Sequence, residues 1–384
     1  MKQELNESSH AIGLVLPGGG ARAAYQVGVI KALATLHGDR TTNPYRVLCG
    51  TSAGAINAVA LASRANDFVD AAHWLESLWS QLSTDQIYRS DFLGVLRNAW
   101  RLLISLFNAG VAVGRPVGLL DNTPLRELLR EKLDFGAISR NLADGHLDAL
   151  SVTAMDYTQG VSLSFFQGGP ERAGWQRWRR QGIPTPIDLS HVMASTAIPT
   201  IFPPEKISKH YFGDGALRQL TPISPALHLG ADKVLIIPAN GHRREYKRLP
   251  RKITSPAFGQ IIGHLLNSAF VDSIETDIER LERINQLIRL MPPQDSFTEH
   301  QLRPIDALVI SPSEDIDALA DEYVDGLPRS IKTFFRSSGT RYSGGVNVAS
   351  YLLFTHEFSE RLIQLGYKDG MANIEDLRHF VYGE

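Results

Sequence analysis

A serine set between two glycines is the strongest sign of chemistry in this sequence. Ser52 lies in Gly50-Thr51-Ser52-Ala53-Gly54, directly after a short apolar run and before a helical pattern. In a strand–turn–helix of this kind the serine hydroxyl projects from a tight turn, and the glycines leave room for strand and helix to pass close by. The backbone amide of Ala53 can then point at a developing oxyanion. These residue types indicate a serine nucleophile acting on an acyl group.

A second glycine-rich turn precedes the first. Gly18-Gly19-Gly20-Ala21-Arg22 also lies between a strand pattern and a helical pattern, so its amides form an anion-binding concavity at the positive end of a helix. One interpretation is an oxyanion hole for acyl transfer. The other is a dinucleotide site, since Gly18-x-Gly20-x-x-Ala23 fits that pattern and Asp39 stands where a ribose-binding acid would be sought. However, Asp39 follows a helix and does not end a second strand.

A candidate catalytic carboxylate comes much later in the chain. Asp214 lies in Gly213-Asp214-Gly215-Ala216, and the preceding Tyr211-Phe212 makes it an acid at a strand end, where catalytic groups of α/β sheets gather. A Ser–Asp–His triad is one possible arrangement, and its histidine would follow Asp214. The eligible residues are His228, His242, His264, His300, His356 and His379.

These groups need a sheet whose strands end at a common edge. The apolar runs at 11–17 and 46–49 predict buried strands, each followed by a glycine turn and a helix, at 21–37 and 55–63. This alternation predicts an α/β fold with a parallel core. Ser52 and Asp214 are expected on exposed turns, and side chains at Gly19 or Gly20 are expected to block the ester more than they disturb folding. Further strands are predicted at 149–155, 161–166, 233–238 and 307–310, and helices at 187–197, 255–291 and through most of 322–384.

Together the three motifs resemble the patatin-like phospholipase family, over about Ile12 to Ile310. The stretch from Ala194 to Pro199, followed by Phe202-Pro203-Pro204, is also similar to the family's segment ahead of its Asp-Gly turn. One departure is Ala23, where many members have glycine. The resemblance implies a Ser–Asp dyad without histidine, with Ser52 as nucleophile and Asp214 as base. A carboxylate in a dry pocket, with a raised pKa, can take the proton of a serine hydroxyl. The resemblance further implies an oxyanion hole from Gly18, Gly19, Gly20 and Ala53, with Arg22, Gly50, Gly54 and Gly215 in support.

The resemblance also implies a fold and an activity. The fold is a three-layer α/β/α arrangement with a mostly parallel central sheet, and the activity is hydrolysis of phospholipids or other lipid esters through an acyl-enzyme, without cofactor or metal. We expect a polar tail at 1–10, an acyl hydrolase domain at 11–315 and a helical extension at 316–384. Two alternatives stay open: an esterase with a histidine triad, and a lipid- or nucleotide-binding module without activity.

Composition narrows the classes of partner. The 384 residues carry 39 Lys and Arg against 41 Asp and Glu, which argues against a nucleic-acid partner. Cys49 is the only cysteine, so no intramolecular disulfide and no zinc site of several cysteines can form. The start of the chain lacks a secretory pattern, and the most apolar stretch, 93–113, contains arginines. We therefore expect a cytoplasmic protein, and the oligomeric state stays open.

Two features bear on membrane contact. Apolar residues recur at helical spacing from Phe92 to Val111, which predicts either a core helix or a mobile cover that meets lipid. Basic residues cluster at 172–180, together with two tryptophans, and again at 243–252. These clusters are either solvated loops or a surface that attracts anionic lipid and makes the protein peripheral to a membrane.

Overall fold

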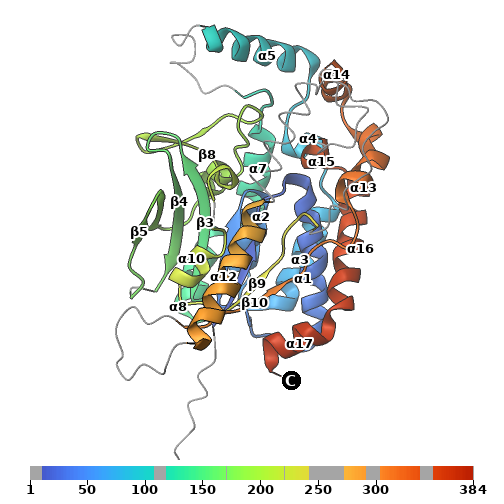
Figure 1. Cartoon of the computed structure of the whole chain (residues 1–384). Helices are drawn as coiled ribbons and strands as arrows, with labels where there is room; N and C mark the ends of the chain where they lie inside the picture. The colour runs from blue at the N-terminus through green and yellow to red at the C-terminus, as the bar shows by residue number, and fades with distance from the viewer. Residues whose placement is uncertain are drawn as a thin grey trace, which may run out of the picture.

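The computed structural model describes residues 11–107, 118–169, 171–219, 221–241, 272–290, 303–337 and 349–383. A ten-stranded sheet runs through the molecule (Figure 1). Its strands are β1 (Ile12–Leu16), β2 (Val47–Thr51), β3 (Ala149–Asp156), β4 (Val161–Gly168), β5 (Trp175–Arg177), β6 (Arg180–Pro184), β7 (Glu205–Ile207), β8 (His210–Asp214), β9 (Lys233–Ile236) and β10 (Asp306–Val309). Their order is β10-β9-β1-β2-β3-β4-β6-β5, with β8 also paired to β3 and β7 to β8.

The first five strands in this order form a parallel core. β10, β9, β1, β2 and β3 run in the same direction, whereas β3 and β4 are antiparallel. Every residue of β1 and β2 is buried, as expected for strands that are covered on both faces. Leu14 and Leu16 pack into one core, while Val15 packs with Val47 and Cys49 into another on the opposite face.

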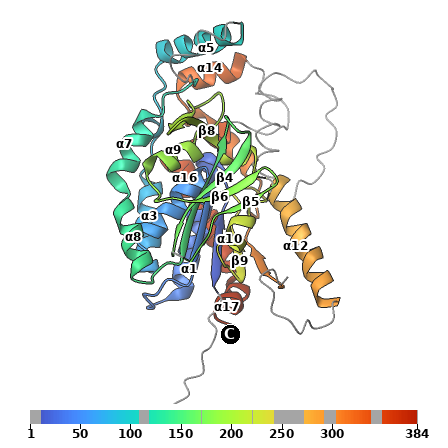
Figure 2. The same cartoon turned by 90° about the vertical axis from the view of Figure 1, so that its left-hand side faces the viewer.

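Helices cover both faces of this sheet, so the predicted three-layer α/β/α fold with a mostly parallel sheet is confirmed. α10 and α12 lie on one face, while α1, α2, α3, α8 and α16 lie on the other (Figure 2). The helices are α1 (Ala24–His37), α2 (Ala53–Ser63), α3 (Phe68–Ser80), α4 (Thr84–Ile87), α5 (Phe92–Phe107), α7 (Thr123–Lys132), α8 (Phe135–Ala143), α9 (Leu189–Ser195), α10 (Ser224–His228), α12 (Asp272–Leu290), α13 (Ile316–Tyr323), α14 (Arg329–Ser337), α15 (Ala349–Leu352), α16 (His356–Ala372) and α17 (Ile374–Tyr382). Short 3-10 helices are η1 (Gly20–Ala23), η2 (Gly215–Leu217) and η3 (Val324–Gly326).

The C-terminal helices form part of a layer of the fold. α16 lies along α1 (Figure 1), and glycines let their backbones touch. A Cβ on Gly28 would stand 2.0 Å from the Ile363 carbonyl oxygen, and one on Gly366 would stand 2.1 Å from that of Tyr25. A side chain at either glycine would therefore push α1 and α16 apart and open a gap in the core between them.

The structure differs from the predicted elements in several places, including three stretches of the chain. The helix expected at 21–37 begins with η1, because the glycine loop enters it through a tighter turn. The hairpin of β5 and β6 was not predicted, since its sequence is a basic run with only two tryptophans. Of the helix expected at 255–291, residues 272–290 are helical, and the remainder lies outside the described residues.

Candidate active site

Strand β3 brings the predicted nucleophile and base together. β2 runs parallel to β3 until Thr51 stands opposite Thr153. From the next residue, Ala154, the same edge of β3 pairs with the antiparallel β8, and Ala154 stands opposite Asp214. β2 and β8 therefore meet end to end on one edge of β3. Ser52, which follows Thr51, arrives where Asp214 ends its strand.

The two side chains form a direct hydrogen bond. Ser52 Oγ donates to Asp214 Oδ2 at 2.6 Å, and the other carboxylate oxygen accepts from the Ala216 amide at 3.0 Å. Only 1% of Ser52 and 0% of Asp214 is exposed. The expectation that both occupy exposed turns is therefore wrong, because helices and the C-terminal segment cover the carboxyl edge of the sheet above them.

Burial sets the acidity of the candidate base. It raises the pKa of Asp214 to about 7, although the hydrogen bonds from Ser52 and the Ala216 amide act in the opposite direction. Among the described residues, no cationic side chain forms an ion pair with Asp214 to offset this effect. A carboxylate whose pKa lies near neutral pH is matched to accepting and returning a proton during turnover.

The serine is held in an uncommon backbone conformation by a neighbour. Ser52 has a φ of 54° and a ψ of −130°, a region that side-chain-bearing residues rarely occupy. The buried hydroxyl of Ser195 accepts a hydrogen bond from the Ser52 amide at 2.8 Å and donates one to the Thr153 carbonyl at 2.6 Å. Ser195 ends α9 and thereby fixes the turn to β3. Ser195 lies in the segment that resembles the family's, but its contact with Ser52 could not be predicted from the sequence.

The predicted supporting glycines lie where no side chain would fit. A Cβ on Gly54 would stand 2.0 Å from the Leu16 carbonyl oxygen, because α2 starts against the end of β1. A Cβ on Gly50 would stand 2.5 Å from Ala55 Cα, and one on Gly215 would stand 2.2 Å from the Thr153 carbonyl oxygen. These glycines let the strand, the helix and the Asp-Gly turn converge on one point.

The glycine loop packs against the C-terminal segment. Gly18 and Gly19 lead from β1 into η1, and Gly20 adopts a φ of 55°. A Cβ on Gly20 would stand 2.3 Å from the Tyr351 carbonyl oxygen, and one on Gly19 would stand 2.6 Å from Ala239 Cβ. Side chains there would therefore point into the protein. The expectation that they would obstruct the ester more than they disturb folding is wrong.

Arg22 ties the glycine loop to the C-terminal helices. Its guanidinium, almost fully buried, donates to Asn240 Oδ1, to Asp317 Oδ1 at 2.5 Å and, through Nε, to Ser350 Oγ at 2.8 Å. It also lies 4.0 Å from the centre of the Tyr351 ring. α13 and α15 thus hold the residue that directly follows the loop.

A narrow apolar cavity of about 30 Å³ adjoins these groups. Gly20, Ser52 and Ala53 contribute to its lining, so the loop and the serine turn face the same space. Further lining residues include Ile56, Trp79, Leu82, Leu125, Leu129 and Phe354. Such a volume holds roughly two water molecules, so a longer apolar group can enter only if the walls move apart.

The described histidines lie away from the dyad. His228 stacks on Trp175, His356 donates to the Ser80 carbonyl, and His379 is exposed on α17. Within the described ranges, no histidine forms a hydrogen bond with Ser52 or Asp214. The remaining candidates of the triad, His242, His264 and His300, lie outside the described residues.

The dinucleotide interpretation fails on position. Asp39 follows α1, whereas the glycine loop precedes that helix. A helix of 14 residues spans about 21 Å, so it separates the acid from the loop. In the part of the chain that the structure describes, no three metal-binding side chains gather into a site.

The predicted basic surface is only partly exposed. Arg172 donates to the Leu229 carbonyl, Arg180 donates to the Thr221 hydroxyl, and Trp175 stacks on Phe166. Of this cluster Arg177, Trp178 and Arg179 are exposed. The second cluster, 243–252, lies outside the described residues. None of the described helices combines the length and apolar character needed to cross a bilayer.

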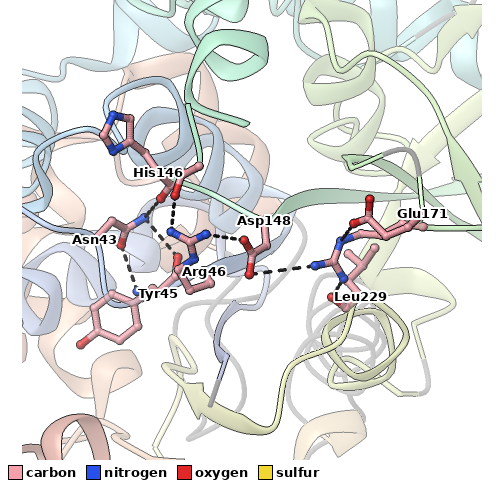
Figure 3. Close-up of polar contacts among 9 residues, drawn as sticks. Asn43, Tyr45, Arg46, His146, Asp148, Glu171 and Leu229 are labelled. Atoms are coloured by element: carbon pink, nitrogen blue, oxygen red, sulfur yellow. Dashed lines mark hydrogen bonds and ion pairs between the residues drawn. The ribbon is translucent and has the colours of Figure 1, made fainter. Parts of the chain in front are cut away.

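A polar network lies at the amino ends of the same strands (Figure 3). Arg46 precedes β2, Asp148 precedes β3, and their side chains form an ion pair at 2.5 Å. The guanidinium of Arg172 lies 4.0 Å from the other oxygen of Asp148 and 3.5 Å from Glu171. At this edge of the sheet, the carboxylate is paired with two cations.

Comparison with known proteins identifies the family. The model of the patatin-like phospholipase family matches residues 14–227, more than half of the chain. The chain therefore belongs to the patatin-like phospholipase family. No curated protein matches it.

Two solved structures with similarity to the chain are VipD from Legionella pneumophila and human GIVD cytosolic phospholipase A2 in complex with methyl γ-linolenyl fluorophosphonate. VipD is 14% identical with a TM-score of 0.36, and the match covers 96% of this chain and 67% of that one. The human enzyme is 13% identical with a TM-score of 0.43, and the match covers 100% and 60%. The chain thus spans about two-thirds or less of these proteins.

Proposed function

We propose that this protein is a serine lipid acyl hydrolase of the phospholipase A or lysophospholipase type, acting through a dyad of Ser52 and Asp214. The observation that carries the proposal is the 2.6 Å hydrogen bond from the serine hydroxyl to a fully buried carboxylate. The apolar cavity beside the dyad and the membership of the family support it.

The proposed reaction needs only these two side chains and backbone amides. Asp214 takes the proton of Ser52 Oγ as that oxygen attacks the ester carbonyl carbon. Amides of Gly18, Gly19, Gly20 and Ala53 stabilise the oxyanion that forms. The alcohol then leaves with the proton from Asp214, and the acyl group stays on Ser52. Asp214 next deprotonates a water molecule, which attacks the acyl-enzyme. Ser52 Oγ then leaves with that proton from Asp214, and the fatty acid is released.

The lining of the cavity indicates the substrate class. Its walls are formed largely by aliphatic and aromatic side chains, which match a methylene chain and offer little to a polar group. The polar atom of Trp79 is already engaged, since its Nε1 donates to Asn57 Oδ1 at 2.7 Å. A fatty-acyl ester of a cytoplasmic membrane lipid, approached from the bilayer surface, is the substrate that we propose.

Active-site labelling and hydrolysis test this function together. A fluorophosphonate should label the parent protein and fail to label Ser52→Ala, because the probe reacts with an activated serine oxygen. Purified parent protein should release fatty acid from phospholipid, and both Ser52→Ala and Asp214→Asn should release none above background. Labelling that persists in Ser52→Ala would refute the assignment of the nucleophile. A folded parent that neither labels nor hydrolyses would identify a binding module.

A further inference from the structure

Helix α5 has two apolar sides, and only one of them is used within the fold. Val95 is buried, and Ala99 and Leu102 pack against the core. Phe92, Leu96 and Trp100 follow one another at intervals of four, so they share a different side of the helix. These three side chains are more than half exposed, and Trp100 is 64% exposed. Of the two alternatives that the sequence left open, a plain core helix does not fit the outer side of α5.

The helix is attached to the walls of the cavity beside Ser52. Asn98 Nδ2 donates to the Leu119 carbonyl at 3.4 Å, and the Leu119 amide donates to the Thr200 carbonyl at 2.9 Å. Thr200 stands between Ile198 and Phe202, which both line the cavity. In Figure 1, α5 lies beyond α4 and α7 at the end of the molecule opposite the C-terminus. The apolar surface of α5 is thus linked through these hydrogen bonds to the walls of the cavity beside Ser52.

Charge favours one occupant of this surface. Arg97 is exposed and Arg101 half-buried on α5, and the helix contains no acidic residue. Arg329 is exposed at the start of α14, where the Ser330 hydroxyl donates to the Ser90 carbonyl at 2.6 Å. Two copies of the chain packed through α5 would place these cations against their equivalents. An anionic lipid surface would pair with the cations and also accept the apolar side chains.

We propose that α5 is an interfacial helix through which the protein docks on anionic membranes, with Phe92, Leu96 and Trp100 inserted among the lipids and Arg97, Arg101 and Arg329 against the head groups. The tryptophan suits the boundary between acyl chains and head groups. This role deepens the proposed lipid hydrolysis, because docking at α5 brings substrate to the walls of the cavity. Docking itself requires no turnover, so the two ideas can be tested separately.

Vesicle binding is measured first, in the Ser52→Ala background so that no lipid is consumed. The protein should co-sediment with vesicles of phosphatidylcholine and phosphatidylserine, and added salt should weaken this binding. Leu96→Ser combined with Trp100→Ser should lower the partition coefficient by at least about tenfold, given the apolar area withdrawn from lipid. Arg97→Gln combined with Arg101→Gln should lower it by roughly fivefold per arginine and flatten its dependence on salt.

The matched control uses exposed leucines elsewhere. Leu287→Ser combined with Leu290→Ser removes two strongly exposed apolar side chains from α12, and this variant should bind vesicles like the parent. Lipids brominated along their acyl chains should quench tryptophan fluorescence in the parent, and Trp100→Phe should remove most of the quenching. Equal binding of the α5 variants and the parent would overturn the proposal. A dimer in sedimentation that the Leu96→Ser, Trp100→Ser variant dissolves would overturn it in favour of a second copy.

A soluble short-chain ester separates this proposal from the proposed function. With Ser52 present, the α5 variants should hydrolyse such an ester at the parental rate while losing activity on vesicles. If Ser52→Ala leaves hydrolysis of the soluble ester intact, the proposed dyad fails, and the vesicle measurements still decide the role of α5.

Discussion

Two aspartates lie near opposite ends of strand β3, and they differ in burial and in the charges around them. Asp148 precedes the strand and has two arginines within 4.0 Å, Arg46 and Arg172. Asp214 stands opposite Ala154 towards the other end and accepts hydrogen bonds only from neutral donors, Ser52 and an amide, among the described residues. The first carboxylate is partly exposed and the second is fully buried. Arginines thus compensate the charge of Asp148 at one edge of the sheet. A charge on Asp214 is left uncompensated at the other edge, where we propose catalysis.

This difference has an energetic reason. A buried carboxylate without a cation is costly when ionised, so its pKa rises towards neutrality. A carboxylate with a neighbouring guanidinium is stabilised as an anion and makes a poor proton acceptor for a serine. The cation that would stabilise Asp214 in the folded protein would also remove the basicity that the proposed reaction requires. The comparison yields four predictions.

The largest expected effect is on turnover. Asp214→Asn should lower kcat for a soluble ester by about 10⁴-fold, because an amide cannot take the proton of Ser52. Asp148→Asn is the matched control and should leave kcat within twofold of the parent, as roughly expected for a site distant from the chemistry. Steady-state kinetics of the purified variants measures both values. A comparable loss of kcat in both variants would contradict the view that only Asp214 takes part in the reaction.

The second effect is on stability, with opposite signs for the two aspartates. The folded pKa of Asp214, about 7, lies above its unfolded value near 4, so the folded state holds a proton that the unfolded state has lost between these values. Stability from this group is therefore complete below about pH 4 and is lost as the pH rises through about 7. At pH 8 the folded parent carries the full free-energy cost of ionising the buried Asp214, which is at most about 4 kcal/mol. Asp214→Asn removes this cost.

Asp148→Asn should change stability in the other direction. It leaves Arg46 and Arg172 without their shared carboxylate, which should lower the free energy of unfolding by about 1–2 kcal/mol. Denaturant titration of the parent and both variants at pH 8 gives the two differences. Destabilisation by Asp214→Asn at this pH would contradict the view that its charge is uncompensated.

The third effect is on the pH profile. Asp214 must be ionised to act as a base, so kcat/KM should rise about tenfold per pH unit up to about pH 7 and then level off. Asp148→Asn should leave this midpoint in place. Rates are compared only over the pH range in which circular dichroism shows the native fold. A midpoint near pH 4 would show that the dyad carboxylate titrates like an exposed one.

The smallest effect concerns the neighbour that holds the nucleophile. Ser195→Ala leaves the Ser52 amide and the Thr153 carbonyl without their shared hydroxyl, so the turn should lose its fixed geometry. We expect kcat to fall about tenfold with little change in KM, which corresponds to about 1.4 kcal/mol. Ser190→Ala, at the half-buried start of the same helix, is the control and should leave kcat unchanged. An unaltered kcat in Ser195→Ala would reduce Ser195 to a packing residue.

The sequence allowed local structure to be predicted far better than long-range contact. The strand before Ser52 and the helix after it were predicted correctly, because glycine spacing and apolar runs constrain only neighbouring residues. The meeting of Ser52 with Asp214 spans 162 positions and depends on the handover from β2 to β8 along β3. No local pattern encodes that pairing, so the burial of the dyad and the part played by Ser195 were missed.

The C-terminal side of the cavity escaped prediction for the same reason. Phe354 lines the cavity and the Tyr351 backbone packs against Gly20, yet both lie in a stretch where the sequence showed only helical periodicity. Amphipathic spacing indicates that a helix is covered on one side, and it does not indicate what covers it. The exposed side of α5 is a second example, since the sequence alone does not distinguish its apolar residues from core residues.

The hydrogen bond between Arg22 and Ser350 also bears on when the proposed active site is complete during synthesis. The two residues are 328 positions apart, and the second belongs to the helices that hold the glycine loop. At roughly 5–20 residues per second, a ribosome needs about 15–65 seconds to add that intervening length. During that time the nascent chain carries Ser52 and Asp214 without the residue that binds Arg22 beside the glycine loop. The active site that we propose is therefore complete only after residue 350 has been synthesised.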